Sequence, residues 1–251
     1  MQASRIFRGA YAAVLESEDS AVSNTAVRKD VWVRVPPAAP FDSIPWPKCR
    51  ATPPDPTACV DERGLGPLYV YLLGVYLGDG MLSRQANGVW RLRVFQDARY
   101  ADIIKACAGA MIEIAGNRVN SVRRQGCLEL VSTWKHWLCV FPQHGSGPKH
   151  LRKISLEAWQ LQLVERHPKE LIKGLIHSDG CRVINRVRNR LGVRYQYPRY
   201  FFTNHSDDIR ATFVHACELI GVEYRPNNRW NISVAKRGSV AILDEFIGLK
   251  S

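Results

Sequence analysis

The sequence predicts an α+β protein built from two similar domains. Two observations carry this prediction. An apolar segment that ends in Asp-Gly occurs twice, as LLGVYLGDG over 72–80 and as IKGLIHSDG over 172–180, so that Asp79 and Asp179 lie 100 residues apart. Each copy also starts the same order of expected elements, helix-strand-strand-helix-strand-strand-helix. A repeat of this length indicates two related domains rather than a solenoid of short units.

The expected elements of the first copy follow its sequence in order. A helix over 67–79 leads into a hairpin whose turn is Gln85-Ala86-Asn87-Gly88, because Asn-Gly favours a tight turn, and whose second strand covers 89–96. A helix over 99–115 follows. Strands over 118–123 and 127–132 then flank the turn Gln125-Gly126, and a last helix is expected over 133–141.

The second copy repeats this order. We expect a helix over 168–179, a long hairpin over 181–204 that turns near Leu191-Gly192, and a helix over 207–220. Strands over 223–226 and 229–234 should turn at Asn227-Asn228, before a final helix over 238–247. A further helix is expected over 156–166.

The domain boundaries follow from composition. Eight of the 14 prolines fall between Pro36 and Pro56. Such Pro-rich, weakly patterned sequence does not pack a core, so we expect residues 1–65 to form a disordered N-terminal segment. We place the first domain at 66–145, an inter-domain connection at 146–167 and the second domain at 168–251.

Bulk composition restricts the class of protein. The chain has 251 residues and a formal net charge of +12, which favours a polyanionic partner, most often nucleic acid. Its seven cysteines form no Cys-x-x-Cys pair, so reduced thiols in a cytoplasmic protein are expected. No stretch approaches the roughly 20 apolar residues that span a bilayer, and we expect no membrane partner.

The two repeated segments carry small residues four positions apart, at Gly74 and Gly78 and at Gly174 and Ser178. Residues at this spacing share one face of a helix. Glycine inside a helix costs about 1 kcal/mol relative to alanine, and close packing of two helices would offset that cost. The alternative is two ordinary core helices that end at glycine caps. The presence of two matching copies favours packing of one helix against the other.

Packing of these two helices would bring Asp79 and Asp179 together. A carboxylate is unfavourable at the C-terminal end of a helix, which is already negative, and two neighbouring carboxylates repel each other. A divalent cation such as Mg²⁺ removes both penalties, because hard cations prefer oxygen ligands. The sequence therefore predicts a metal site at this pair.

The strand segments are basic. Residues 181–205 contain six arginines and no Asp or Glu, and residues 81–96 and 116–128 also carry arginines without an acid. Alternation predicts one apolar and one basic face, with Arg91 and Arg93 opposite Leu92 and Val94. By the same rule, Arg182, Arg186, Arg188 and Arg190 should lie opposite Val183 and Val187, and Arg229, Asn231 and Ser233 opposite Trp230, Ile232 and Val234. A β-ribbon of this kind can enter the major groove of DNA.

These two motifs, with their flanking elements and spacing, resemble the LAGLIDADG homing endonucleases in the monomeric form that carries two motifs per chain. The resemblance covers about residues 66–250. The sixth motif position, acidic in the family's namesake, is Leu77 and His177 here, while the eighth matches Asp79 and Asp179. The resemblance implies two pseudo-symmetric αββαββα domains, each with a four-stranded antiparallel saddle sheet, packed through the motif helices.

The resemblance also implies an activity and a set of site residues. It implies an intron-encoded, metal-dependent endonuclease that cuts both strands of a long asymmetric DNA target, acting as a monomer near the nucleoid. Asp79 and Asp179 would be catalytic and hold the metal with the backbone carbonyls of Gly78 and Ser178. Lys135 and Lys236, after the last strand of each domain, would lie near the cleaved phosphate. The predicted DNA-binding residues are Arg84, Arg91, Arg93, Arg118, Arg123, Arg182, Arg186, Arg188, Arg190, Arg194, Arg229 and Asn231.

Two other functions remain open from the sequence. The chain is either an endonuclease, a DNA-binding regulator that has lost cleavage, or a maturase that binds the RNA of its intron. The presence of both aspartates favours the enzyme. A zinc site at His136, Cys139, His144 and His150 is a weaker alternative, because their spacing matches no familiar tetrahedral pattern.

Overall fold

The computed structural model of the chain describes residues 65–188, 190 and 192–248. The predicted N-terminal segment lies outside these residues except for Leu65. The first half consists of α3 (Pro67–Asp79), β1 (Gly80–Arg84), β2 (Trp90–Asp97), α4 (Ala101–Ala115), β3 (Asn120–Arg124), β4 (Cys127–Trp134) and α5 (Trp137–Val140). The short 3-10 turn η1 (Ala86–Gly88) joins β1 to β2.

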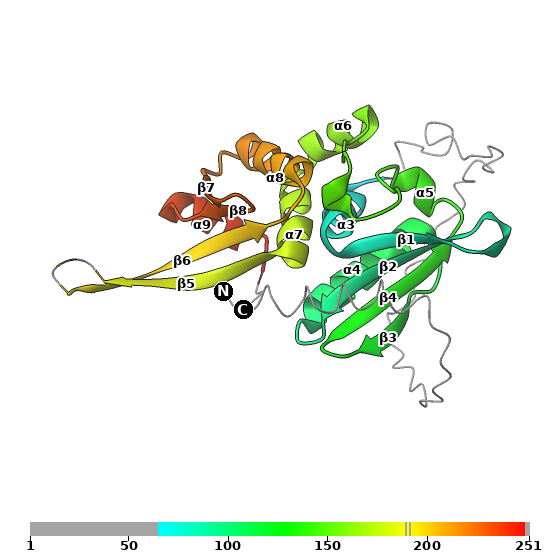
Figure 1. Cartoon of the computed structure of the whole chain (residues 1–251), viewed down its shortest axis with the longest axis horizontal. Coiled ribbons are helices and arrows are strands. Elements are labelled where there is room, and N and C mark those ends of the chain that lie inside the picture. Colours follow the sequence, from blue (N-terminus) through cyan, green and yellow to red (C-terminus); the bar gives the residue numbers. More distant parts are fainter. Residues whose placement is uncertain (1–64, 189, 191, 249–251) are drawn as a thin grey trace. The chain divides into compact units, whose positions relative to one another are not determined.

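The second half repeats the order of the first. It consists of α7 (Pro168–Asp179), β5 (Gly180–Arg188), β6 (Arg194–Thr203), α8 (Asp207–Leu219), β7 (Arg225–Asn228), β8 (Asn231–Val234) and α9 (Arg237–Asp244). The 3-10 turn η2 (Lys149–Leu151) and α6 (Ala158–Arg166) lie in the connection between the halves (Figure 1). The predicted order αββαββα is therefore present twice.

Each half contains one four-stranded antiparallel sheet, and the two sheets have the same topology. The strand order is β1-β2-β4-β3 in the first sheet and β5-β6-β8-β7 in the second. In both, the strand that leaves the motif helix pairs first with its hairpin partner, which then pairs with the last strand of its half. The predicted fold class, α+β with two pseudo-symmetric halves, is confirmed.

One face of each sheet packs against helices, and we call it the covered face. In the first sheet this face carries Leu92 and Val94, both completely buried. In the second it carries Tyr200 and Phe202, and the Phe202 ring stacks on Phe213 of α8 at 4.5 Å between ring centroids. The opposite face of each sheet, the open face, is not covered by the helices of its half.

The two motif helices contact each other through their backbones. A Cβ atom added at Gly74 of α3 would lie 2.6 Å from the Leu171 carbonyl oxygen and 2.8 Å from the Leu175 nitrogen of α7. A Cβ atom at Gly174 would collide with the Tyr71 carbonyl oxygen of α3, and one at Gly78 with the Ser178 side chain. No side chain larger than hydrogen fits at Gly74 and Gly174, so the glycines permit a separation that alanine would prevent.

The composition of α3 agrees with a central position. Its residues from Tyr69 to Leu77 are all buried, and a helix that is apolar on every side belongs inside a protein. Both motif helices begin at a proline, Pro67 and Pro168. Proline suits the first helical position, where its missing N–H has no intrahelical partner to lose.

Two local predictions were wrong. The final turn of the second sheet lies at Arg229-Trp230, because Asn228 still pairs with Asn231 after an irregularity between Pro226 and Asn228. The helix expected from Thr133 begins only at Trp137, since β4 continues to Trp134 opposite Trp90 of β2. In both places, pairing with a neighbouring strand extends the sheet beyond the residues that local sequence assigned to it.

The glycine contact between the motif helices can be tested with a matched pair of variants. Gly174→Ala should lower the free energy of unfolding by about 3 kcal/mol, because its methyl group meets backbone that cannot move alone. Gly109→Ala, inside α4, should raise stability by up to about 1 kcal/mol, since nothing lies within 4 Å of its added Cβ. Urea-induced unfolding measures both, and equal effects would contradict the packing.

Candidate functional site

Both motif aspartates occupy the last position of their helices. The next residue, Gly80 or Gly180, starts a strand and donates its backbone N–H to the carbonyl of Tyr76 or Ile176. These glycines have extended backbones rather than the left-handed conformation of a glycine cap. A Cβ atom would lie 2.6 Å from Tyr76 Cα at Gly80 and 2.7 Å from Ile176 Cα at Gly180. Glycine after each aspartate is therefore required for close approach, as the chain passes directly from helix to strand.

The carboxylate of one motif lies against the backbone of the other. A Cβ atom added at Gly78 of α3 would lie 3.0 Å from Asp179 Oδ2 of α7. Gly78, Ser178 and Asp179 are thus gathered where the two helices end. Ser178 turns its hydroxyl back to its own helix, where it donates to the carbonyls of Gly174 at 3.1 Å and Leu175 at 3.0 Å.

Each aspartate accepts a hydrogen bond from a side-chain amide. Gln96 Nε2 donates to Asp79 Oδ2 at 3.1 Å, and Asn204 Nδ2 donates to Asp179 Oδ2 at 2.6 Å. The two amides are related by the internal repeat: each lies two residues beyond the residue that pairs with the motif glycine, Val94 or Phe202. The sequence analysis did not predict Gln96 and Asn204 as site residues. A carboxamide side chain at the matching position of both repeats could have indicated them.

A lysine from the connection reaches the end of α3. Lys149 Nζ donates to the carbonyl oxygens of Gly80 at 2.6 Å, Gly78 at 3.3 Å and Tyr76. It also lies over the Tyr76 ring, 4.7 Å from its centroid. Its ammonium therefore faces the negative end of the helix dipole.

Burial and charge act in opposite directions on this lysine. Burial lowers the pKa of Lys149 to about 8, while the charges of Asp179 and Asp79 oppose that decrease. At neutral pH a group with this pKa is still mainly protonated. The sequence places Lys149 in the inter-domain connection and gave no sign that it would reach the motif helices.

The two lysines predicted to be catalytic lie elsewhere. Lys135 is exposed in the turn after β4. Lys236 precedes α9 and forms an exposed ion pair with Glu223. Their role near a phosphate remains a prediction.

The predicted zinc alternative finds no support in the described part of the chain. His136 lies 3.8 Å from Cys139 Sγ through Nδ1, His144 packs on Trp90, and His150 packs on His205. The described residues include no group of three or more His, Cys, Asp or Glu side chains that could hold a metal ion.

The open face of the first sheet is basic. Arg91 and Arg93 lie opposite Leu92 and Val94, as alternation predicted. Arg124 shares this face, and the buried carboxylate of Glu129 holds both neighbouring guanidinium groups: Arg93 Nε donates to Oε1 at 2.6 Å and Arg124 Nε to Oε2 at 2.8 Å. Glu129 is therefore a fixed acid that orients two arginines.

Other predicted DNA-binding arginines of this half are placed differently. Arg84 pairs with Trp90 and Arg123 with Leu128, so both belong to the face opposite Arg91 and Arg93. Arg118 precedes β3. The side chains of all three arginines are exposed.

The alternation predicted for β5 is present, with Arg182, Arg186 and Arg188 on the side opposite Val183 and Val187. The expectation that the arginine side is the open face was wrong. Arg182 pairs with Tyr200 and therefore lies on the covered face, where it forms a bidentate ion pair with Asp244 of α9 at 2.8 and 2.9 Å. The Arg182 guanidinium lowers the pKa of the Asp244 carboxyl. Arg186 and Arg188 have the same parity as Arg182, and Arg190 follows in the exposed turn.

The error has a physical cause. Strand β6 pairs with β8 only over Tyr200–Thr203, so most of the β5–β6 hairpin extends beyond the rest of its sheet (Figure 1). Val183, Ile184 and Val187 are all more than a third exposed. Where no helix covers either face, alternation of apolar residues does not report which side is buried.

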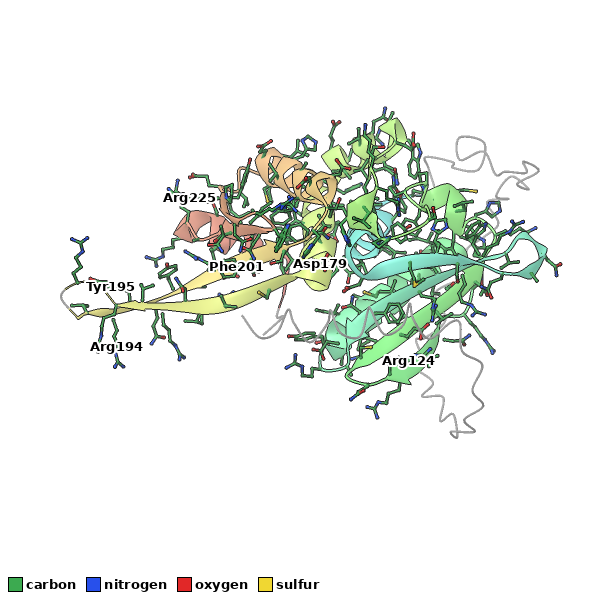
Figure 2. The ribbon with its side chains drawn as sticks, in the orientation of Figure 1. Arg124, Asp179, Arg194, Tyr195, Phe201 and Arg225 are labelled. Atoms are coloured by element: carbon green, nitrogen blue, oxygen red, sulfur yellow. The ribbon has the colours of Figure 1, made fainter. Side chains whose placement is uncertain are left out.

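The open face of the second sheet combines arginine with aromatic residues. Phe201 pairs with Ser233, which pairs in turn with Arg225, so these residues share the open face. Arg199 also belongs to it, with its guanidinium carbon 5.3 Å from the Phe201 ring centroid. Figure 2 shows Phe201 and Arg225 on this half, and Arg194 and Tyr195 near the tip of the hairpin. Asn231, predicted here, donates to Thr203 Oγ1 on the same face, and Arg229 lies over the Trp230 ring in the adjoining turn.

No protein-family profile matches the sequence, and a search of curated proteins finds no match. Among solved structures, the chain is similar to the I-LtrWI LAGLIDADG homing endonuclease bound to target DNA, at 9% identity and a TM-score of 0.45, over 74% of this chain and 85% of that chain.

It is also similar to the N-terminal LAGLIDADG domain of DUF199/WhiA, at 9% identity and a TM-score of 0.45, over 73% of this chain and 83% of that chain. A third similar structure is I-SmaMI bound to uncleaved DNA in the presence of calcium ions, at 10% identity and a TM-score of 0.46, over 74% of this chain and 85% of that chain. At these values, the solved structures assign no activity to this chain.

None of the described helices is both long and apolar enough to cross a membrane.

The placement of Arg182 against α9 predicts a difference between two arginines of one strand. Arg182→Ala should lower the free energy of unfolding by up to about 1 kcal/mol, because Asp244 and Tyr200 lose their partner. Arg186→Ala should change it by less than about 0.5 kcal/mol. Pairing with Arg182 lowers the Asp244 pKa. The decrease in the free energy of unfolding caused by Arg182→Ala should therefore become smaller as the pH falls below about 4 and the Asp244 carboxyl protonates. Thermal unfolding from pH 7 to pH 3 measures this, and equal effects would contradict the placement.

Proposed function

We propose that this protein is a site-specific endonuclease that hydrolyses phosphodiester bonds in double-stranded DNA. One observation carries the proposal. The carboxylates of Asp79 and Asp179 lie where two contacting helices end, and each accepts a hydrogen bond from an amide of its own half, Gln96 in β2 or Asn204 directly after β6. The candidate reactive groups are therefore held by side chains in or next to the strands that form the candidate DNA-binding faces.

The proposal that DNA is the partner rests on the net charge of the chain and on the arginines of the two open faces. The net charge is +12, and the open faces carry Arg91 and Arg93 in one half and Arg199 and Arg225 in the other. Arginine binds phosphates and reads guanine in the major groove. Two related faces in one chain suit a long target whose two halves differ in sequence.

The donor atoms at the helix ends suit a hard divalent cation. The two carboxylates and the Gly78 carbonyl are oxygen donors, which is the chemistry that Mg²⁺ prefers. The Lys149 ammonium bound to that carbonyl supports the proposal that positive charge is favourable at this position. When bound, such a cation would polarise the phosphate and lower the pKa of a water molecule.

The remaining roles belong to side chains of this chain. Gln96 and Asn204 would hold the two carboxylates in fixed orientations, and Lys149 would contribute positive charge beside them. Lys135 and Lys236, if the resemblance to the homing endonucleases holds, would approach the phosphate on DNA binding. We also propose a cytoplasmic protein that acts as a monomer.

The second candidate function is a DNA-binding regulator that does not cut. The observation in its favour is that Lys149 already neutralises the end of α3, so the paired carboxylates do not by themselves require a metal ion. The presence of both aspartates with both amide partners supports the endonuclease. Binding of intron RNA by the same basic faces remains a prediction.

The aspartates distinguish the enzyme from the regulator. Asp79→Asn and Asp179→Asn should each lower the rate of double-strand cleavage by at least about 10²-fold, while DNA binding stays close to wild type because the shape and the amide contact are kept. The target is found by selecting cleaved sites from a randomised duplex library with Mg²⁺. If wild type binds but recovers no cleaved sites, the protein is a regulator; if the asparagine variants cut at the wild-type rate, the proposed site is wrong.

The open faces predict which arginines bind the duplex. Arg199→Ala and Arg225→Ala should each weaken DNA binding, and loss of a phosphate contact should lower the slope of log affinity against log salt concentration by about one. Arg166→Ala, at the exposed end of α6 and away from both sheets, is the matched control. Gel-shift titration over a range of salt concentrations measures these effects, with RNA of equal length as competitor. Equal loss in all three variants would mean that overall charge, rather than the open face, governs binding.

A further inference from the structure

The end of α3 combines several negative groups at one point. The last carbonyls of a helix have no intrahelical partners and carry the negative end of its dipole. Asp79 adds a carboxylate at the same place, and Asp179 adds a second from α7, against Gly78. Without a cation, this arrangement would be destabilised by repulsion among like charges.

Lys149 supplies that cation with all three of its N–H donors. An ammonium group has three donors and no acceptor, and Lys149 Nζ has three carbonyl partners: Tyr76, Gly78 and Gly80. The face of the Tyr76 ring provides further attraction for the charge. This is the arrangement of a bound ion with oxygen ligands, although the ion is tethered to the chain.

The segment that carries Lys149 is held in place on its C-terminal side. Arg152 donates to the Gln143 carbonyl, so the loop between these residues is closed. The backbone N–H of Ile154 donates to Asp208 Oδ2 of α8 at 2.7 Å. The lysine is therefore delivered to α3 by a connection that is itself bonded to the second half.

We propose that the Lys149 ammonium is a resident cation of the site and competes with a divalent ion for the end of α3. This inference deepens the proposed function, because it concerns the same carboxylates. Binding of the ammonium and a divalent cation to the Gly78 carbonyl at the same time is unfavourable, since the two positive charges repel at short range. Lys149 thus stabilises the site without metal and weakens its affinity for metal, and metal binding moves the ammonium away from Gly78.

Substitution of Lys149 by methionine tests the competition. Lys149→Met keeps an unbranched side chain and removes the charge. In EDTA its melting temperature should fall below that of wild type, and Mg²⁺ should raise it by more than it raises wild type. Its affinity for Mg²⁺, measured by isothermal titration calorimetry without DNA, should increase more than about tenfold. Lys153→Met, an exposed lysine of the same connection, should behave as wild type.

A second measurement uses the unmodified protein, in case Lys149→Met does not fold in EDTA. Reductive methylation followed by peptide mass spectrometry reports how accessible each lysine is. Mg²⁺ should increase the methylation rate of Lys149 several-fold and leave that of Lys153 unchanged. Unchanged or slower methylation of Lys149, or metal affinity in Lys149→Met that is equal to or weaker than wild type, would overturn the competition. Neither readout involves DNA cleavage, so a protein that never cuts DNA can still satisfy or contradict this inference.

Discussion

The backbone contact between α3 and α7 is the constraint on which the rest of the structure depends. Gly74 and Gly174 let the two helices approach until carbonyl oxygens of one meet the backbone of the other. Each helix then passes directly into the first strand of its sheet through Gly80 or Gly180. The separation of the helices therefore sets the distance between the two carboxylates and the spacing of the first strands of both sheets. One close contact therefore sets the positions of the two carboxylates and of the surfaces around them together.

Sequence patterns predicted the parts of this structure that burial controls. The repeated glycines, the order of elements and the alternation around Leu92 all reflect groups that must be inside. The facing of β5 was not predictable in this way, because a charged residue, Arg182, lies on the covered face, where it forms an ion pair with Asp244, a residue 62 positions away. The contacts of Lys149 were also not predictable from local pattern, since a lysine in a connecting segment looks like any solvated lysine until the fold brings α3 beside it.

Lys149 also changes the physical argument for a metal ion. From sequence, two carboxylates at two helix ends predict an external cation. In the fold, an ammonium group already binds the carbonyls at one of these ends, and its lowered pKa reflects the cost of burying it there. The need for charge neutralisation is therefore not sufficient evidence for metal. The proposal of a metal ion rests instead on the set of oxygen donors at the helix ends and on the amides of Gln96 and Asn204, which bind the two carboxylates.

The exposure of the β5–β6 hairpin affects which residues of this protein can be substituted during evolution. Beyond its contact with β8, neither face of the hairpin belongs to the core, and Arg186, Arg188 and Arg194 are exposed. Exposed positions of this kind tolerate replacement at little cost to folding, whereas the glycines between the motif helices do not. Mutations in the hairpin can therefore alter what the protein contacts while the helix pair and its carboxylates stay intact. Evolution, or an engineer, can vary recognition and preserve the folded scaffold at separate sets of residues.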